Sequence, residues 1–257
     1  MKWNIKQIKN IKLKEAVMLE GLPGIGNVGK IAVDFIIDST KASKIYEITS
    51  DSFPNCVFVN EENEIELPKV EIFHKKINKR DLLLVSGDVQ PIDEASSYEF
   101  CNKLVDIFKS KKGKEIITLG GMGLMEIPKN PKIFCTGTNK KIIEKYAAEK
   151  NSEMFGMIGP IIGVSGLLLG VAKQKNVQGV ALLAETYGHP TYLGIQGARE
   201  ILNLLNKKLK LNINIKELDK EAKEMEREIN KIKNLDKVMK KSKKTNEQKM
   251  EFADYIG

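Results

Sequence analysis

The chain has 257 residues, of which 42% are hydrophobic, and a formal net charge of +8. This length and apolar content suffice for one large core, whereas no apolar run reaches the roughly 20 residues of a membrane span. Eight lysines and two acidic residues between 231 and 249 account for +6 of the charge, which argues against a nucleic-acid surface. With no signal-peptide pattern and three widely spaced cysteines, we expect a soluble, cytoplasmic protein without disulfides or a zinc site.

A glycine-rich segment at 21–30 is the first feature along the chain that indicates chemistry. Gly24, Gly26 and Gly29 have the G-x-G-x-x-G spacing of a dinucleotide-binding loop, between a strand-like apolar run and a helix-like one. Such a site also needs an acidic residue about 20 positions later, and Glu47 is a loose candidate.

The same segment nearly completes a phosphate-binding loop. Gly24 to Lys30 fits G-x-x-x-x-G-K, but Ile31 replaces the serine or threonine that would bind magnesium. Three interpretations stay open: glycines that permit a tight turn and close helix packing, an anion bound at the helix N-terminus, or a hydrolysed nucleotide.

Apolar runs alternate with amphipathic segments along the chain, which predicts an α/β domain with a mostly parallel sheet flanked by helices. The expected strands are 16–20, 45–49, 82–86, 115–119 and 180–184. The expected helices are 29–38, 92–109, 139–150, 163–174 and 191–208.

Residues 53–75 interrupt this succession of strands and helices, and their alternating apolar and polar residues are typical of hairpin strands. The apolar positions in the pattern are Val57, Val59, Ile65, Leu67, Val70 and Ile72. We expect a hairpin insertion at the sheet edge, which is a candidate for subunit contacts.

Further glycine clusters follow the expected strands, at 86–88, 120–123, 159–163 and 185–190. Because the carboxyl ends of strands form the usual ligand crevice of an open α/β sheet, we expect these loops to converge on one pocket. The candidate crevice residues are Gly24, Gly26, Gly29, Lys30, Asp88, Gly121 and Glu185.

The polar candidates for chemistry in this crevice are Asp88, Glu126, Glu185 and His189. They form neither a catalytic triad nor a zinc motif, and Glu185 and His189 have an alternative role as capping and turn residues. We therefore predict no catalytic residue and no metal ligand.

Five blocks in a fixed order resemble a known family. They are LEGLPGIGNVGK at 19–30, RDLLLVSGDVQP at 80–91, IITLGGMG at 116–123, GPIIGVSGLLLG at 159–170 and LLAETYGHP at 182–190. This order is similar to that of the proteasome assembly chaperones, specifically the archaeal homologues of the second eukaryotic chaperone subunit. The resemblance extends from about residue 16 to residue 208, the whole predicted globular part.

The resemblance implies a three-layer α/β/α domain, related in shape to nucleoside-phosphorylase-like folds. It also implies a non-catalytic homo-oligomer, a tetramer in relatives, that binds proteasome α-subunits, the α-ring or the 20S core particle without a cofactor. Some members have carried an ATP-grasp label, but this chain has no convincing cluster of metal-binding carboxylates. The alternative is a nucleotide- or small-molecule-binding enzyme, ATP-grasp-like or nucleoside-phosphorylase-like, that uses the glycine-rich crevice.

Beyond a globular domain at 1–212, apolar residues recur at alternating steps of four and three, which predicts an amphipathic helix at 213–239. The stripe consists of Leu218, Ala222, Met225, Ile229, Ile232 and Met239, and its last step of seven residues skips the polar Asp236. The helix either packs on its own domain or pairs with a neighbouring subunit. In the second case the oligomerisation residues are Leu218, Met225, Ile229, Ile232 and Met239.

Residues 240–257 are predicted to be a flexible basic tail with a terminal anchor. Phe252, Tyr255, Ile256 and the terminal Gly257 suit capture in a lysine-lined pocket between ring subunits, with binding multiplied by oligomeric valency. Relatives often end in hydrophobic-Tyr-X, whereas Tyr255 is third from the end, which leaves the docking pose open. The alternative is a tail whose aromatic residues fold back on the body.

Overall fold

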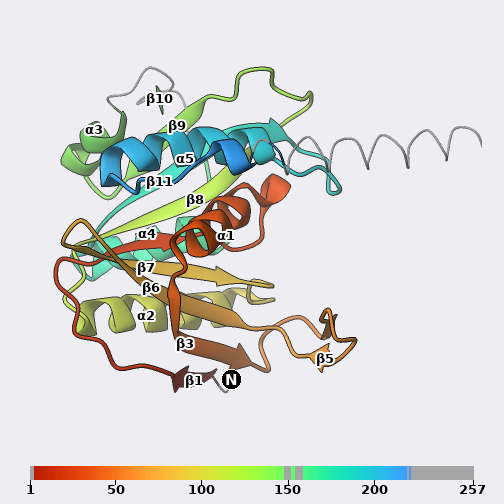
Figure 1. Ribbon diagram of the computed structural model, residues 1–257, viewed down its shortest axis with the longest axis vertical. Coiled ribbons are helices and arrows are strands. Elements are labelled where there is room, and N and C mark those ends of the chain that lie inside the picture. The colour runs from red at the N-terminus through yellow and green to blue at the C-terminus, as the bar shows by residue number, and fades with distance from the viewer. Residues whose placement is uncertain (1–2, 148–151, 154–158, 219, 221–257) are drawn as a thin grey trace, which may run out of the picture. The chain divides into compact units, whose positions relative to one another are not determined.

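The computed structural model describes residues 3–147, 152–153, 159–218 and 220. The chain divides into a first unit that ends at Asn214 and a second unit that begins at Ile215. The first unit has an α/β fold in which a mixed sheet is packed with helices (Figure 1). Of the predicted apolar stripe only Leu218 is described, and the predicted tail at 240–257 lies outside the described residues.

Nine strands of the described residues form one sheet, in the order β1-β3-β6-β7-β2-β8-β11-β9-β10. They are β1 (Trp3–Gln7), β2 (Val17–Glu20), β3 (Ser43–Ser50), β6 (Val70–Ile77), β7 (Arg80–Gly87), β8 (Glu115–Leu124), β9 (Ile133–Gly137), β10 (Ser152–Glu153) and β11 (Gln178–Tyr187). The central strands β7, β2, β8 and β11 are parallel, whereas β1, β3 and β6 on one side and β9 on the other join by antiparallel pairing. The prediction of a mostly parallel sheet is therefore correct only for the centre.

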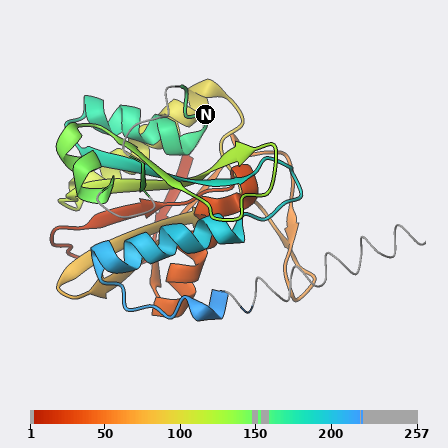
Figure 2. The same cartoon turned by 90° about the horizontal axis from the view of Figure 1, so that it is seen from above.

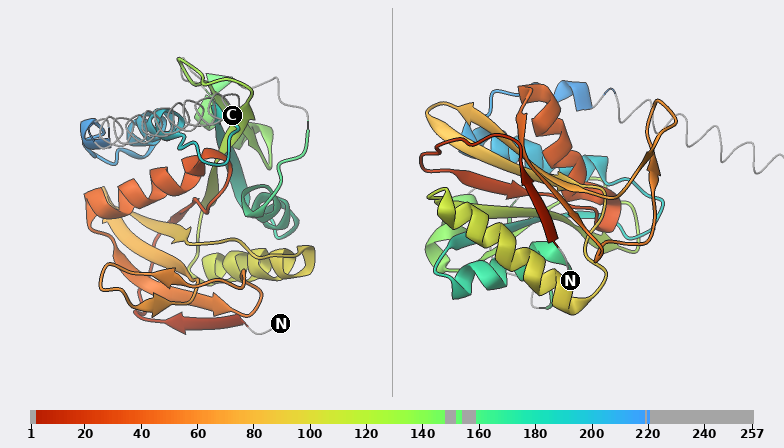
Figure 3. Two further views of the ribbon diagram at one scale, coloured as in Figure 1. Left: turned by 90° about the vertical axis from the view of Figure 1, so that its right-hand side faces the viewer. Right: turned by 90° about the horizontal axis from the view of Figure 1, so that it is seen from below.

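Five helices of the described residues cover the sheet. They are α1 (Val28–Thr40), α2 (Glu94–Ser110), α3 (Lys140–Ala147), α4 (Val164–Gln174) and α5 (Ile195–Leu209), and a 3-10 turn, η1 (Ile25–Asn27), precedes α1. Helices α1 and α5 pack together on one face and α2 and α4 on the other, which gives three layers (Figures 2 and 3). No helix in the described part of the chain is long and apolar enough to cross a membrane.

The central strands are the ones that the sequence predicts best. Every residue of β2 is buried, as is every residue of β7 except Arg80. Strands that are covered on both faces appear in the sequence as unbroken apolar runs. The five expected strands correspond to β2, β3, β7, β8 and β11, and the five expected helices correspond to α1 to α5.

The expected hairpin at 53–75 contains two different features. Strands β4 (Phe58–Val59) and β5 (Ile65–Glu66) pair as a short hairpin that is separate from the main sheet. Residues 70–77, by contrast, form β6, which lies inside the main sheet between β3 and β7. Its alternating pattern arises because Val70 and Ile72 are fully buried whereas Glu71 between them is half-buried.

The direction of the strands gives the molecule two different edges. Strands β2, β3, β7, β8 and β11 all end at the same edge, which we call the carboxyl edge, and begin at the opposite amino edge. The turn η1 and the β4–β5 hairpin lie at the carboxyl edge, where the hairpin extends beyond the sheet (Figure 1).

Candidate functional site

A cavity of about 220 Å³ opens at the carboxyl edge. Its walls come from the glycine-rich loop after β2, from 119–123 in β8 and from 160–165 at the start of α4. Three of the predicted glycine clusters therefore meet here. Most of the lining is glycine or apolar, and Gln90 and Ser165 are the polar side chains among the described lining residues.

The glycines of this loop are required because there is no room for a side chain. A Cβ atom on Gly21 would lie 2.1 Å from the carbonyl oxygen of Gly29, and one on Gly29 would lie 2.2 Å from that of Leu119. A Cβ atom on Gly121 would lie 2.2 Å from the carbonyl oxygen of Ile25. Backbone thus packs directly on backbone, which supports the interpretation of these glycines as close-packing residues.

Gly26 has a different role from the other loop glycines. It adopts φ 62°, and its carbonyl oxygen accepts a hydrogen bond of 2.7 Å from the N–H of Gly194, just before α5. This bond fixes η1 against the start of α5, and Gly26 is not among the residues that line the cavity. The loosely expected ribose ligand, Glu47, lies on β3, which β6 and β7 separate from β2.

Gln90 joins the glycine-rich loop to the start of α4. Its Nε2 donates to the carbonyl oxygen of Pro23 at 2.5 Å, and its Oε1 accepts from the N–H of Val164 at 2.9 Å. The side chain thereby fixes the two segments on either side of the cavity. The sequence gives no signal for this role, because the partners lie 67 and 74 residues away from Gln90.

Glu20, at the end of β2, is a fully buried carboxylic acid behind the wall of the cavity. Its Oε1 accepts from the N–H of Leu22 at 3.2 Å, whereas its Oε2 has no partner among the described residues. Burial raises the pKa of Glu20 to about 7, and the Ser165 hydroxyl and the Leu22 N–H partly offset this rise. Because Leu22 and Ser165 line the cavity, a group that changes charge near neutral pH lies directly behind its wall.

A second unpaired polar group accompanies this carboxyl. Thr118 on β8 is the register partner of Glu20, and its buried Oγ1 has no hydrogen-bond partner among the described residues. The charge of Glu20 also affects Cys101, because burial and then the neighbouring carboxylate raise the pKa of that thiol. Sequence reasoning missed Glu20 because one glutamate at the end of an apolar strand resembles a surface residue.

Most of the predicted polar crevice residues have partners elsewhere. Lys30 forms an ion pair of 2.9 Å with Asp34 on its own helix. The carboxylates of Asp88 and Glu185 accept backbone N–H groups at 3.2 and 3.0 Å. Of the seven predicted crevice residues, the cavity therefore brings together only Gly24, Gly29 and Gly121.

The remaining polar candidates behave as turn and surface residues. The Nδ1 atom of His189 lies 3.0 Å from the Oγ1 of Thr191, and its ring stacks on that of Tyr187. Glu126 is exposed on the loop after β8. Within the described residues, no group of three or more histidine, cysteine or acidic side chains is placed to hold a metal ion.

Comparison with known proteins identifies the family. Residues 18–233 match the model of the PAC2 family. The chain belongs to the PAC2 family. A relative from Methanocaldococcus jannaschii, MJ1210, is 30% identical over 254 residues, which cover 98% of this chain and 96% of that protein.

Two solved archaeal structures are similar to this PAC2 chain. Pyrococcus furiosus PbaB, described as an archaeal proteasome activator, has a TM-score of 0.82 and 31% identity, covering 90% of this chain and 98% of PbaB. Pyrococcus furiosus PbaA, described as an archaeal homolog of proteasome-assembly chaperone, has a TM-score of 0.74 and shares the fold at 22% identity, covering 98% and 99% of the two chains. The predicted resemblance to archaeal proteasome assembly chaperones is therefore confirmed.

Proposed function

We propose that this PAC2 protein is a non-catalytic factor for proteasome assembly or activation. It binds proteasome α-subunits, the α-ring or the 20S core particle as a cytoplasmic homo-oligomer, with a tetramer as the expected state. The observation that carries the proposal is the similarity to the proteasome activator PbaB, at 31% identity over 90% of the chain.

The geometry of the cavity favours binding over catalysis. Its described lining is glycine and apolar side chains with two neutral polar groups, and Lys30, Asp88 and Glu185 are engaged outside it. General acid–base catalysis needs titratable groups within hydrogen-bond reach of a substrate. The alternative of a nucleotide- or small-molecule-binding enzyme therefore has less support.

The proposed contact with the α-ring uses the C-terminal residues. Phe252, Tyr255, Ile256 and Gly257 form the anchor, and the polar stretch before them serves as a tether. The amphipathic segment at 213–239 pairs the subunits and brings several tails together. Several linked weak anchors bind far more tightly than one, so oligomerisation and the tail act jointly.

Binding of recombinant archaeal proteasome α-subunits tests this function. We expect the full-length chain to form a complex by size exclusion with light scattering, and a chain ending at Glu251 to bind at least roughly ten-fold more weakly. The unfolding temperature of the truncated chain is expected to match that of the full chain, since the body is unchanged.

Two point variants separate the anchor from the tether. Tyr255→Ala removes an anchoring ring, whereas Lys243→Ala changes the tether and serves as the matched control. The tail has no role if the chain ending at Glu251 binds like the full-length chain, and Tyr255 has no role if Tyr255→Ala does. The proposed function itself fails if the full-length chain forms no complex with α-subunits.

A further inference from the structure

Exposed apolar side chains gather at one edge of the molecule. Of the twelve large apolar side chains that are exposed in the described residues, ten lie on carboxyl-edge loops. They are Ile25, Val57, Phe58, Val59, Ile65, Leu67, Ile92, Met125, Ile127 and Ile162. Large apolar side chains that are exposed together on one side of a domain mark an interaction site.

This surface has two ends that differ in charge. The hairpin wing, residues 57–67, carries four glutamates and no lysine or arginine. The loop wing, residues 125–132, carries the exposed Lys129 and Lys132 and a single glutamate. Both wings present apolar side chains beside these charges: Ile65 is 71% exposed in the first and Met125 is 93% exposed in the second.

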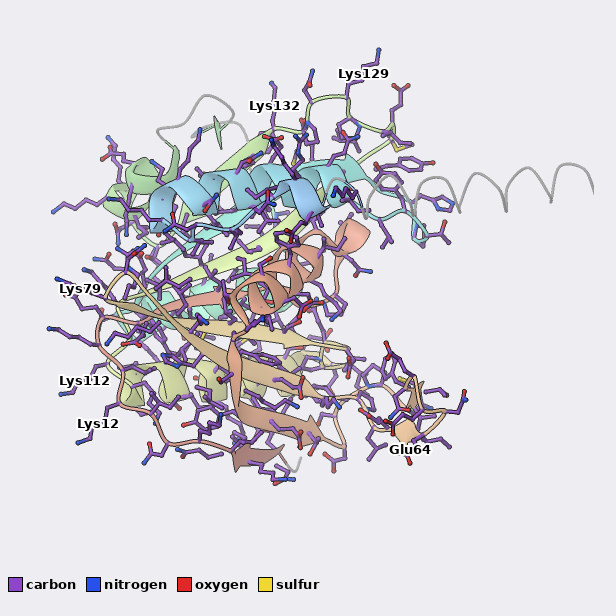
Figure 4. All side chains as sticks on the ribbon, in the orientation of Figure 1. Lys12, Glu64, Lys79, Lys112, Lys129 and Lys132 are labelled. Carbon is purple, nitrogen blue, oxygen red and sulfur yellow. The ribbon has the colours of Figure 1, made fainter. Side chains whose placement is uncertain are left out.

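The two wings lie on opposite sides of the cavity. The hairpin wing connects β3 to β6, whereas the loop wing connects β8 to β9, and β7 and β2 lie between them in the sheet. Figure 4 shows Glu64 of the hairpin wing at one end of the carboxyl edge and Lys129 and Lys132 of the loop wing at the other. Ile25 and Ile162 occupy the middle, at the rim of the cavity.

We propose that the carboxyl edge is a self-association surface, in which the hairpin wing of one copy meets the loop wing of a second copy. A two-fold rotation about an axis perpendicular to the sheet turns the two carboxyl edges toward each other and reverses the strand order. Each acidic wing then faces a basic wing, and every contact occurs twice. The inference rests on the homo-oligomeric part of the proposed function and adds a second contact surface to that of the amphipathic segment.

A second copy is the occupant that the charges favour. A partner with the same charge on both wings would match only one of them, whereas a second copy turned in this way matches both. The hairpin also needs a partner, because two-residue strands that expose Phe58, Val59 and Ile65 are at best marginally stable in water. At the centre, Ile25 and Ile162 of each copy approach their equivalents and bury the rim of the cavity.

A charge swap tests the proposal without any proteasome subunit. One variant reverses the hairpin wing (Glu61→Lys, Glu62→Lys and Glu64→Lys), and another reverses the loop wing (Lys129→Glu with Lys132→Glu). Each variant alone places like charges opposite each other, so we expect its solution mass by light scattering to be half that of the wild type or less. An equimolar mixture restores complementary charges at both contacts and is expected to recover the wild-type mass.

Lys12→Glu with Lys112→Glu is the matched control for the loop-wing variant, because it makes the same charge change at the amino edge, where Figure 4 shows both lysines. We expect it to leave the mass unchanged, and thermal unfolding to verify that all variants fold. The proposal is overturned if the wild type is monomeric, if each wing variant keeps the wild-type mass, or if the mixture does not recover it. Loss of α-subunit binding with self-association intact would instead contradict only the proposed function.

Discussion

The amino and carboxyl edges of the sheet differ in the residues that occupy their turns. At the amino edge, left-handed turn positions are occupied by lysine and asparagine, including Lys41, Asn78, Lys79, Lys112 and Lys210. At the carboxyl edge the loops are rich in glycine, yet Gly26 and Gly163 are the only glycines with positive φ in the described residues, and Asn27 and Asn63 occupy further left-handed positions. Other residues can thus occupy left-handed turns in this chain, so positive φ does not explain most of the carboxyl-edge glycines. Instead, these glycines allow close packing of backbone on backbone.

The basic character of the amino edge has a local cause. Four helices end there with a lysine at the C-cap: Lys41, Lys111, Lys175 and Lys210. Positive side chains at a helix C-terminus interact favourably with the partial negative charge of the unsatisfied carbonyl groups. These lysines therefore stabilise helices, and Lys175 also forms an ion pair of 2.6 Å with Asp106.

Buried acids show the same contrast between the edges. Near the amino edge, Asp81 accepts from the Lys14 N–H at 2.7 Å and contacts His74, and Glu115 accepts from both Lys145 and Tyr146. At the carboxyl edge, Glu20 has one oxygen without a partner among the described residues. The amino edge thus pairs its buried acids fully, whereas the carboxyl edge leaves one partly unpaired.

Replacement of Glu20 is the sharpest test of this contrast. The folded chain retains the Glu20 proton up to a pKa of about 7, whereas the ordinary value is 4.5. The associated stability is therefore fully present below pH 4.5 and is lost as pH rises through 7. We expect Glu20→Gln to remove this dependence, so its stability relative to the wild type increases by about 3 kcal/mol between pH 4.5 and 8.

Chemical denaturation at several pH values measures this effect. Glu126→Gln, which removes an exposed carboxyl at the same edge, is expected to keep the wild-type pH dependence. If Glu20→Gln and the wild type show parallel stability curves across this pH range, the carboxyl is already satisfied in the folded state, and the contrast between the edges does not extend to buried acids.

A pair of helical glycines tests the role of close packing. A Cβ atom on Gly29 would lie 2.2 Å from a backbone oxygen, whereas one on Gly170 in α4 would have no atom within 4 Å. We expect Gly29→Ala to destabilise the fold by about 2 kcal/mol, because backbone must move to accommodate it. Gly170→Ala is expected to stabilise by about 0.5–1 kcal/mol through helix propensity. Equal effects in urea unfolding would show that the loop is loosely packed.

The sequence predicts the centre of this fold better than its sides. Strands β2 and β7 are recognisable because both faces are covered and the runs are unbroken. Strands β1 and β9 were missed, since β1 is mostly polar and β9 is only five residues long with a glycine at its end. The prediction for β6 was wrong because its alternating pattern, with Val70 and Ile72, indicated a hairpin at the sheet edge, whereas β6 lies between β3 and β7.

The candidate site was also predicted only in part. Glycine spacing predicted that several loops converge, because glycine clusters are visible in one sequence. The roles of Glu20 and Gln90 depend on partners far along the chain, such as Ser165 and Val164, and no local pattern encodes such contacts. The tail anchor at 252–257 stays a prediction, since it lies outside the described residues.

The smallest expected effect concerns an amino-edge turn. Lys41 ends α1 at φ 51°, a conformation that costs a non-glycine residue free energy because its Cβ atom crowds the backbone. Lys41→Gly should relieve this strain. Part of the resulting stabilisation is offset, because glycine gives the unfolded chain more freedom and because the lysine charge is lost. We therefore expect the free energy of unfolding to increase by about 0.5 kcal/mol. Lys41→Ala removes the charge but keeps the Cβ atom, and it is expected to be slightly less stable than the wild type. Urea unfolding of the wild type and the two variants measures the order of their stabilities. If the glycine variant is no more stable than the alanine variant, the lysine turns carry no strain, and the amino edge uses lysine for its charge alone.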